Sequence, residues 1–227
     1  MYTLHIGNKN YSSWSLRPWV LMHMLDIPFD EHQVQFPTGP SFELFRSFSP
    51  SGFVPCLTEN GWAVWDSLGI VEYLAERHSG VWPVEARARS WARCAAAEMH
   101  SSFSALRGAC TFNAGVRIRL ESRSDALKHD LFRLGDLWSD GLGRFGGPFL
   151  AGAHFTAVDA FFAPVAFRAQ TYGLEFAGAA ADYPALLLDL QPMRDWYAAA
   201  LAETWREPSH EAEMLAAGTL LEDLRAA

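Results

Sequence analysis

The fold of this chain is decided by residues 53–67, which read FVPCLTENGWAVWDS. The Asn60-Gly61 pair is a strong signal for a tight hairpin turn, since both residues tolerate a positive φ angle. The residues on either side are therefore expected to form two short antiparallel strands. Ser67 then opens a run of apolar residues at helical spacing, which predicts an amphipathic helix capped by that serine. The apolar residues of this run are Leu68, Ile70, Val71, Tyr73 and Leu74.

A strand that begins next to Pro55 is unusual, because proline has no N–H to donate to a β-ladder. A cis bond between Val54 and Pro55 would explain this arrangement. It would also leave the backbone of Val54 free to bind another partner.

Around this hairpin, the first eighty residues alternate strand and helix patterns. We expect strands at 2–6 and 31–36 and helices at 16–25 and 41–48, before the hairpin and the Ser67 helix. The order β-α-β-α-β-β-α is typical of a thioredoxin-like α/β domain with a mixed four-stranded sheet. Residues 1–79 are predicted to form this domain, and the Gly/Pro-containing segment after it is a plausible linker.

From residue 85 onward the sequence is rich in Ala and Leu and shows no convincing strand. Residues 86–227 are therefore predicted to form an all-α domain. The expected helices are 86–110, 124–144, 156–172, 183–202 and 209–224.

Composition narrows the class of protein. A chain of 227 residues with 50% hydrophobic and 19% charged residues suits a folded globular protein of about two domains. The net charge of −8 argues against a general nucleic-acid-binding protein. Three cysteines without CxxC spacing fit a reducing cytosol, and no apolar run approaches the ~18 residues that a membrane span requires. We therefore expect a cytoplasmic protein with no membrane and no nucleic-acid partner.

The loop NYSSWSLR, residues 10–17, lies between the first predicted strand and the first helix. A hydroxyl at a helix N-terminus stands where free N–H groups favour an anion, and a thiol there would be drawn toward its thiolate form. The same serines could simply cap the helix.

Residues 12–17, SSWSLR, resemble the Ser-Ser-Cys-Ser-Trp-Arg loop of the zeta class within the serine-type cytosolic glutathione transferases. The resemblance implies that Ser12 stabilises the thiolate of glutathione, with Ser13 and Tyr11 as alternatives, and that Ser13 also contacts glutathione. Trp14 replaces the motif cysteine, which argues against a cysteine-based thiol transfer.

Two further segments resemble this family. Residues 49–55, SPSGFVP, resemble its Asn-Pro-x-Gly-x-Val-Pro motif. The resemblance implies that Val54 and Pro55 hold the cysteinyl part of glutathione by edge-strand pairing. It further implies that Ser67 binds the γ-glutamyl carboxylate. Asp66 adds a negative charge that could pair with the γ-glutamyl ammonium group, or this role could fall to the surface of the neighbouring subunit. An ordinary turn and a simple helix cap are the alternative interpretations.

The helical half carries a family likeness as well. Thr156 and Asp159 have the spacing of a capping box before an apolar run, which resembles the box that glutathione transferases keep in their helical domain. The resemblance also implies that the helix at 86–110 lines the pocket for the electrophile. The candidate pocket residues there are Met99, His100, Phe103 and Arg107.

Other chemistry has little support in the sequence. The eight histidines form no HxxxH pair and do not cluster with cysteines, so we expect no metal site. There is also no phosphate-binding glycine loop and no G-x-S-x-G hydrolase motif.

The sequence thus predicts a glutathione transferase, in which a glutathione thiolate attacks a hydrophobic electrophile between the two domains. Glutathione is the expected co-substrate, no metal is involved, and the family norm implies a homodimer. One alternative is a zeta-like cis-trans isomerase that uses glutathione catalytically, although Pro40-Ser41 stands where that class has Gln-Gln. The other is a non-catalytic glutathione-binding or interaction module with the same fold.

Overall fold

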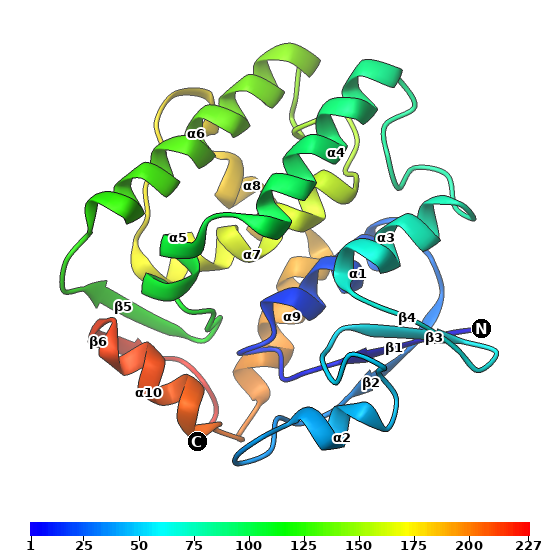
Figure 1. Cartoon of the computed structure of the whole chain (residues 1–227). Helices are drawn as coiled ribbons and strands as arrows, with labels where there is room; N and C mark the ends of the chain where they lie inside the picture. Colours follow the sequence, from blue (N-terminus) through cyan, green and yellow to red (C-terminus); the bar gives the residue numbers. More distant parts are fainter.

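The computed structural model describes all of residues 1–227, and Figure 1 shows a sheet-containing half joined to a larger helical half. The first half has a four-stranded sheet in the order β2-β1-β3-β4, with β1 and β2 parallel and the other pairs antiparallel. The predicted mixed sheet is therefore confirmed. Its elements are β1 (Tyr2–Ile6), α1 (Ser13–Met24), β2 (Phe29–Gln33), α2 (Phe42–Arg46), β3 (Cys56–Glu59), β4 (Trp62–Val64) and α3 (Ser67–Ala75).

The hairpin forms as its sequence predicts. Asn60 and Gly61 have φ angles of 50° and 81°, and the peptide bond between Val54 and Pro55 is cis. The helix cap differs from the prediction by one residue. Asp66 is the N-cap of α3, and its Oδ1 accepts hydrogen bonds from the N–H groups of Leu68 at 2.8 Å and Gly69 at 3.4 Å. Ser67 is the first helical residue, so its hydroxyl is not used for capping.

The second half is mainly helical and is built around α7, which is buried along nearly its whole length. The helices are α4 (Ala86–Ser101), α5 (Ser104–Ala109), α6 (Asp125–Phe145), α7 (Ala157–Tyr172), α8 (Tyr183–Asp189), α9 (Gln191–Ala202) and α10 (Pro208–Ala216), with a 3₁₀ turn at Gly178–Ala180. None of them is long and apolar enough to span a membrane.

Two predicted helices are interrupted. The helix expected at 86–110 breaks at Ser102, which is extended, and at Phe103, whose φ of 61° is left-handed. The helix expected at 183–202 breaks at Leu190, which is extended. Pro192 lacks an N–H and is tolerated only in the first turn, so a new helix begins just before it.

The expectation of no strand in the second half is wrong. Strands β5 (Val116–Leu120) and β6 (Gly218–Asp223) form an antiparallel pair, and the helix predicted at 209–224 ends at Ala216. The alternation of apolar and basic residues in β5 is the sequence signal for this strand. Gly218 is required by close packing, since a Cβ there would lie 2.1 Å from the carbonyl oxygen of Arg119.

One hydrophobic core runs through both halves, because α1 packs directly against α7 and their apolar side chains belong to the same buried cluster. The C-terminal segment returns to the first half, where α10 and the residues after β6 lie beside the loop that follows β1 (Figure 1). The predicted division at residues 79 and 86 stays a prediction, because the shared core crosses it.

The capping box of α7 is present and reaches beyond the helix end. Asp159 is fully buried, and its Oδ2 accepts from the N–H of Thr156 at 2.9 Å. Its Oδ1 accepts from the N–H of Leu150 at 2.9 Å and from the hydroxyl of Tyr183 at 2.8 Å. This carboxylate therefore joins the start of α7 to the preceding loop and to α8.

We predict that Asp159→Ala lowers the free energy of unfolding by about 3 kcal/mol, because three buried donors lose their acceptor. Urea denaturation of the whole chain measures this loss. Asp125→Ala is the matched control, since Asp125 is also an acidic residue in the first turn of a helix but is exposed and paired only with Lys128. Equal stability of the two variants would contradict the role assigned to Asp159.

Candidate active site

The loop between β1 and α1 is held by the carboxylate of Glu203, which follows α9. One oxygen of Glu203 accepts from the N–H of Lys9 at 2.6 Å. The other accepts from the N–H and the side-chain amide of Asn10, both at 3.1 Å. The indole N–H of Trp196 donates to the carbonyl of Lys9 at 3.0 Å. We call this loop between β1 and α1 the serine loop. It is positioned by residues almost two hundred positions away, and the sequence did not predict these contacts.

A chain of hydrogen bonds runs from β1 to Ser12. The N–H of Gly7 donates to the hydroxyl oxygen of Ser15 at 3.2 Å, and the hydroxyls of Ser15 and Ser12 lie 2.6 Å apart. Since Ser15 already accepts one hydrogen bond, its own proton can go to Ser12, and the proton of Ser12 is then free for a third group. Ser12 is the N-cap of α1, where the unpaired N–H groups of the first turn favour an anion.

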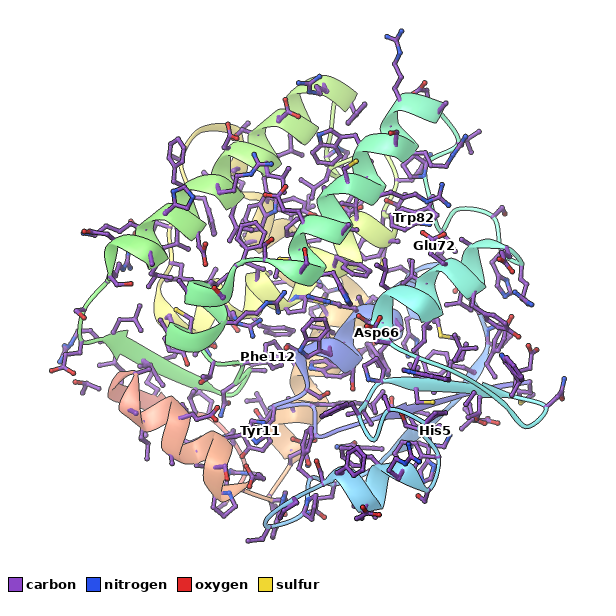
Figure 2. The ribbon with its side chains drawn as sticks, in the orientation of Figure 1. His5, Tyr11, Asp66, Glu72, Trp82 and Phe112 are labelled. Atoms are coloured by element: carbon purple, nitrogen blue, oxygen red, sulfur yellow. The ribbon has the colours of Figure 1, made fainter.

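Tyr11 lies next to the C-terminal segment (Figure 2). Its hydroxyl donates to Glu211 at 2.8 Å and lies 3.4 Å from the guanidinium of Arg225. Burial and then Glu211 raise the pKa of Tyr11. Ser13, the other alternative to Ser12, is buried as the first residue of α1.

The segment before β3 presents a free stretch of backbone. Val54 is half-buried and its neighbour Pro55 is buried. Neither the N–H nor the C=O of Val54 has a backbone partner in the chain. A free donor and acceptor on one extended residue can pair with an extended peptide.

The start of α3 lies against α1 and α4. A guanidinium nitrogen of Arg17 donates to the hydroxyl oxygen of the buried Ser67 at 3.4 Å. Asp66 Oδ2 lies 3.3 Å from Nε2 of His100, and Figure 2 shows Asp66 at the end of α3 that faces the helical half. Burial lowers the pKa of His100, with Arg17 also lowering it, whereas Asp66 acts in the opposite direction.

Trp14 connects the serine loop to this group. Its ring is half-buried, with the guanidinium carbon of Arg17 4.1 Å and that of Arg107 4.8 Å from a ring centroid. The ring of His100 meets it edge-on at 5.2 Å. The indole therefore joins the serine loop to Arg107 of α5 and His100 of α4.

The four residues expected to line the electrophile pocket fall into two pairs. Met99 and Phe103 are buried in the hydrophobic core, whereas His100 and Arg107 are half-buried next to Trp14. A separate cavity of about 600 Å³ lies between the β5–β6 pair and the end of α7, and contains none of the predicted site residues. No group of three or more metal-ligating side chains is present.

Two family models match the chain in tandem. Residues 11–77 match the glutathione S-transferase N-terminal domain, and residues 121–199 match the glutathione S-transferase C-terminal domain. The first range contains the serine loop, the cis-proline segment and the start of α3. The chain belongs to the glutathione S-transferase family.

Solved structures of the family share this fold. A glutathione transferase homolog from Burkholderia with bound glutathione is 18% identical, with 88% of this chain and 97% of that chain covered and a TM-score of 0.66. A Tau class enzyme from mango is 19% identical, with 86% and 92% covered and a TM-score of 0.66. A glutathione S-transferase from Rhodospirillum rubrum is 20% identical, with 95% and 100% covered and a TM-score of 0.64. At these identities, the likeness shows the fold.

We predict that Glu203→Ala loosens the serine loop while the rest of the fold stays intact, because four donors of the first half lose a shared acceptor, the amide of Gln33 included. Amide hydrogen exchange in residues 7–13 should accelerate by about tenfold or more, which corresponds to ~1.4 kcal/mol.

Glu213→Ala is the control for this experiment, because Glu213 is exposed on α10. An unchanged exchange rate in Glu203→Ala would show that the loop holds its shape without this carboxylate.

Proposed function

We propose that this protein is a glutathione transferase in which Ser12 stabilises the thiolate of glutathione. The observation that carries the proposal is the hydrogen-bond chain from Gly7 through Ser15 to Ser12, which allows Ser15 to donate and so frees the proton of Ser12 at the N-terminus of α1. A hydroxyl that donates to the sulfur, next to the helix dipole, lowers the thiol pKa and supplies a nucleophile near neutral pH. The alternative Tyr11 is less suited, since its proton is donated to Glu211.

The tripeptide would be held along the same edge of the first half. Val54 offers its free N–H and C=O to the cysteinyl residue, in the manner of an added β-strand. Ser67, at the start of α3 with Arg17 beside it, suits the γ-glutamyl carboxylate. Asp66 suits the γ-glutamyl ammonium group.

The electrophile would meet the sulfur near Trp14, His100 and Arg107. In the transfer step, the sulfur forms a bond to the electrophilic carbon, and the leaving group departs with its electron pair. Trp14, in place of a cysteine, provides an aromatic surface at this point and no second thiol. The free thiols of Cys56, Cys94 and Cys110 agree with a reducing compartment such as the cytoplasm.

We predict that Ser12→Ala lowers kcat/KM for glutathione and 1-chloro-2,4-dinitrobenzene by about 10²-fold, because one donor to the developing thiolate is lost. The pKa of bound glutathione, followed by ultraviolet absorbance of the thiolate, should rise toward the ~8.5 of a free thiol. The pH profile of kcat/KM should move to higher pH by the same amount.

Ser13→Ala is the matched comparison. If Ser13→Ala shifts the thiol pKa and Ser12→Ala does not, the two serines exchange roles. Glutathione binding without turnover of any electrophile would favour the non-catalytic module. Conversion of a maleyl to a fumaryl substrate without loss of glutathione would favour the isomerase.

We also propose a homodimer, which the family resemblance implies. Its support here is that Phe42, Phe53, Trp62 and Trp65 of the first half are large apolar side chains left exposed. Light scattering should give twice the 25.3 kDa of one chain. Phe53→Asp should shift the mass toward the monomer, whereas Phe132→Asp on α6 should not, although Phe132 is also exposed. A monomeric wild-type chain would contradict the proposal.

A further inference from the structure

Three arginines from three helices converge near the candidate active site. Arg17 belongs to α1, Arg107 to α5 and Arg168 to α7. Arg17 and Arg168 are only 1% and 4% exposed, and Arg107 is half-buried. We refer to these three residues as the arginine cluster.

None of the three arginines forms a salt bridge with a carboxylate. Arg17 donates only to Ser67, and its Nε is buried without a partner. Arg107 donates to the carbonyls of Met99 and Ser102 at the end of α4. Arg168 donates to the carbonyl of Cys110 at 2.7 Å, and its Nη1 is buried without a partner.

Arg225, another buried arginine of this chain, differs from the cluster because it is paired with carboxylates. Its guanidinium pairs with both Glu211 and Asp223, and these two carboxylates raise its pKa. In contrast, burial lowers the pKa of Arg17, with Arg107 and Arg168 adding to the effect. Arg17 and Arg168 are therefore buried guanidinium groups that no carboxylate contacts.

Aromatic rings supply only part of the missing stabilisation. Arg17 lies over Trp14 and Phe161, and Arg168 lies 5.4 Å from the ring centroid of Phe112. Such contacts stabilise a cation by less than it costs to bury an unpaired ion. A bound anion would make up the difference, because guanidinium groups retain their charge and match a carboxylate in shape.

The other charged and titratable groups around the cluster do not neutralise it. Asp66 acts to raise the pKa of Arg17 and Asp130 that of Arg107, but neither carboxylate forms a salt bridge with the cluster. Asp66 caps α3 and contacts His100, and Asp130 accepts from the N–H of Leu106 at 3.0 Å. Tyr172 and Cys110, which lie near Arg168, have raised pKa values because they are buried, and both are neutral near pH 7. The cluster consequently keeps an excess of positive charge.

The accessible edge of the cluster adjoins the proposed thiol position. Trp14 lies in sequence between Ser13 and Ser15, and its half-buried ring contacts both Arg17 and Arg107. Arg17 is turned toward Ser67, on the side proposed for glutathione. Arg107 is the half-buried member, and it lies on the side of the helical half.

We propose that the electrophile of this protein carries a carboxylate, which Arg107 binds in front of Trp14 while Arg17 and Arg168 add to the positive potential. This inference rests on the proposed transferase function and changes its substrate class from a purely hydrophobic electrophile to an anionic one. The carboxylate is bound and not consumed. In the aryl-halide test below, the thiolate sulfur forms the new C–S bond, the C–Cl bond breaks, and chloride leaves with its electron pair.

The test compares 4-chloro-3,5-dinitrobenzoate with its methyl ester, each with glutathione. Each kcat/KM is divided by the uncatalysed rate constant, which removes the different reactivity of the two compounds. We expect the acid to be preferred by about tenfold, equivalent to ~1.4 kcal/mol. A ratio of one or less would overturn the proposal, although turnover of the ester would still support the transferase function.

Substitutions then test which residue is responsible for the preference for the acid over its methyl ester. Arg107→Gln should abolish it without changing the KM for glutathione, and Arg107→Lys should retain part of it. Arg93→Gln is the matched control, because Arg93 is an exposed arginine of α4 that pairs with Glu72. A preference that survives in a folded Arg107→Gln variant would contradict the assigned role of Arg107.

A binding measurement on the wild-type chain is independent of both folding of the variant and turnover. The unreactive 4-amino-3,5-dinitrobenzoate and its methyl ester are titrated against tryptophan fluorescence in the presence of saturating S-methylglutathione. Tighter binding of the acid by about tenfold supports the inference even if no electrophile is turned over. Loss of acid binding when S-methylglutathione is present would overturn it, since the arginines would then serve the carboxylates of glutathione itself.

Discussion

The carboxylate of Glu203 is the constraint on which the candidate site depends. It accepts hydrogen bonds from the backbone N–H groups of two consecutive loop residues, Lys9 and Asn10. No strand or helix supplies a partner for these two groups. Buried backbone N–H groups require a partner, so the loop can adopt its shape only when α9 is in place. Ser12 follows two residues later, and its position is therefore set by the helical half as much as by the sheet.

The same dependence appears at the C-terminus. Arg225 is buried between Glu211 and Asp223, and Glu211 also accepts a hydrogen bond from the hydroxyl of Tyr11. The pairing of β6 with β5 carries this arginine back to the loop after β1. The two halves are consequently joined near the serine loop by the hydrogen bonds of Glu203 and Glu211, in addition to the apolar contact between α1 and α7.

Local chemistry explains which parts of this architecture could be predicted from the sequence. The Asn60-Gly61 turn, the Val54-Pro55 bond and the capping box of α7 depend on neighbouring residues, and the structure agrees with each. The pairing of β5 with β6 was missed because it joins segments about a hundred residues apart. The alternation of apolar and basic residues in β5 was nevertheless visible in the sequence.

In the candidate site, too, features set by neighbouring residues could be predicted, whereas features set by distant residues could not. A serine before a helix is a local pattern, so Ser12 could be selected from the sequence with only its near neighbours as alternatives. The acceptor role of Glu203 could not be predicted, because nothing near it in the sequence connects it to Asn10. The lack of carboxylate partners for Arg17 and Arg168 was equally hidden, since it becomes apparent only when every neighbour of a buried side chain is known.

The residue at position 14 affects both the thiols that the proposed site contains and the positive charge beside them. A cysteine there would place a second thiol next to the first, whereas Trp14 presents a ring face to the guanidinium groups of Arg17 and Arg107. The negative face of an aromatic ring stabilises a cation without neutralising it. Two guanidinium groups can therefore remain close together beside the proposed thiol position, and the half-buried Arg107 is the one that an anion could reach. In water their potential would be weak, but in a partly buried site an unneutralised charge acts strongly on the group that is bound next to it. In the proposed site, tryptophan in place of cysteine would thus remove one kind of thiol chemistry and favour an acidic partner for the thiolate.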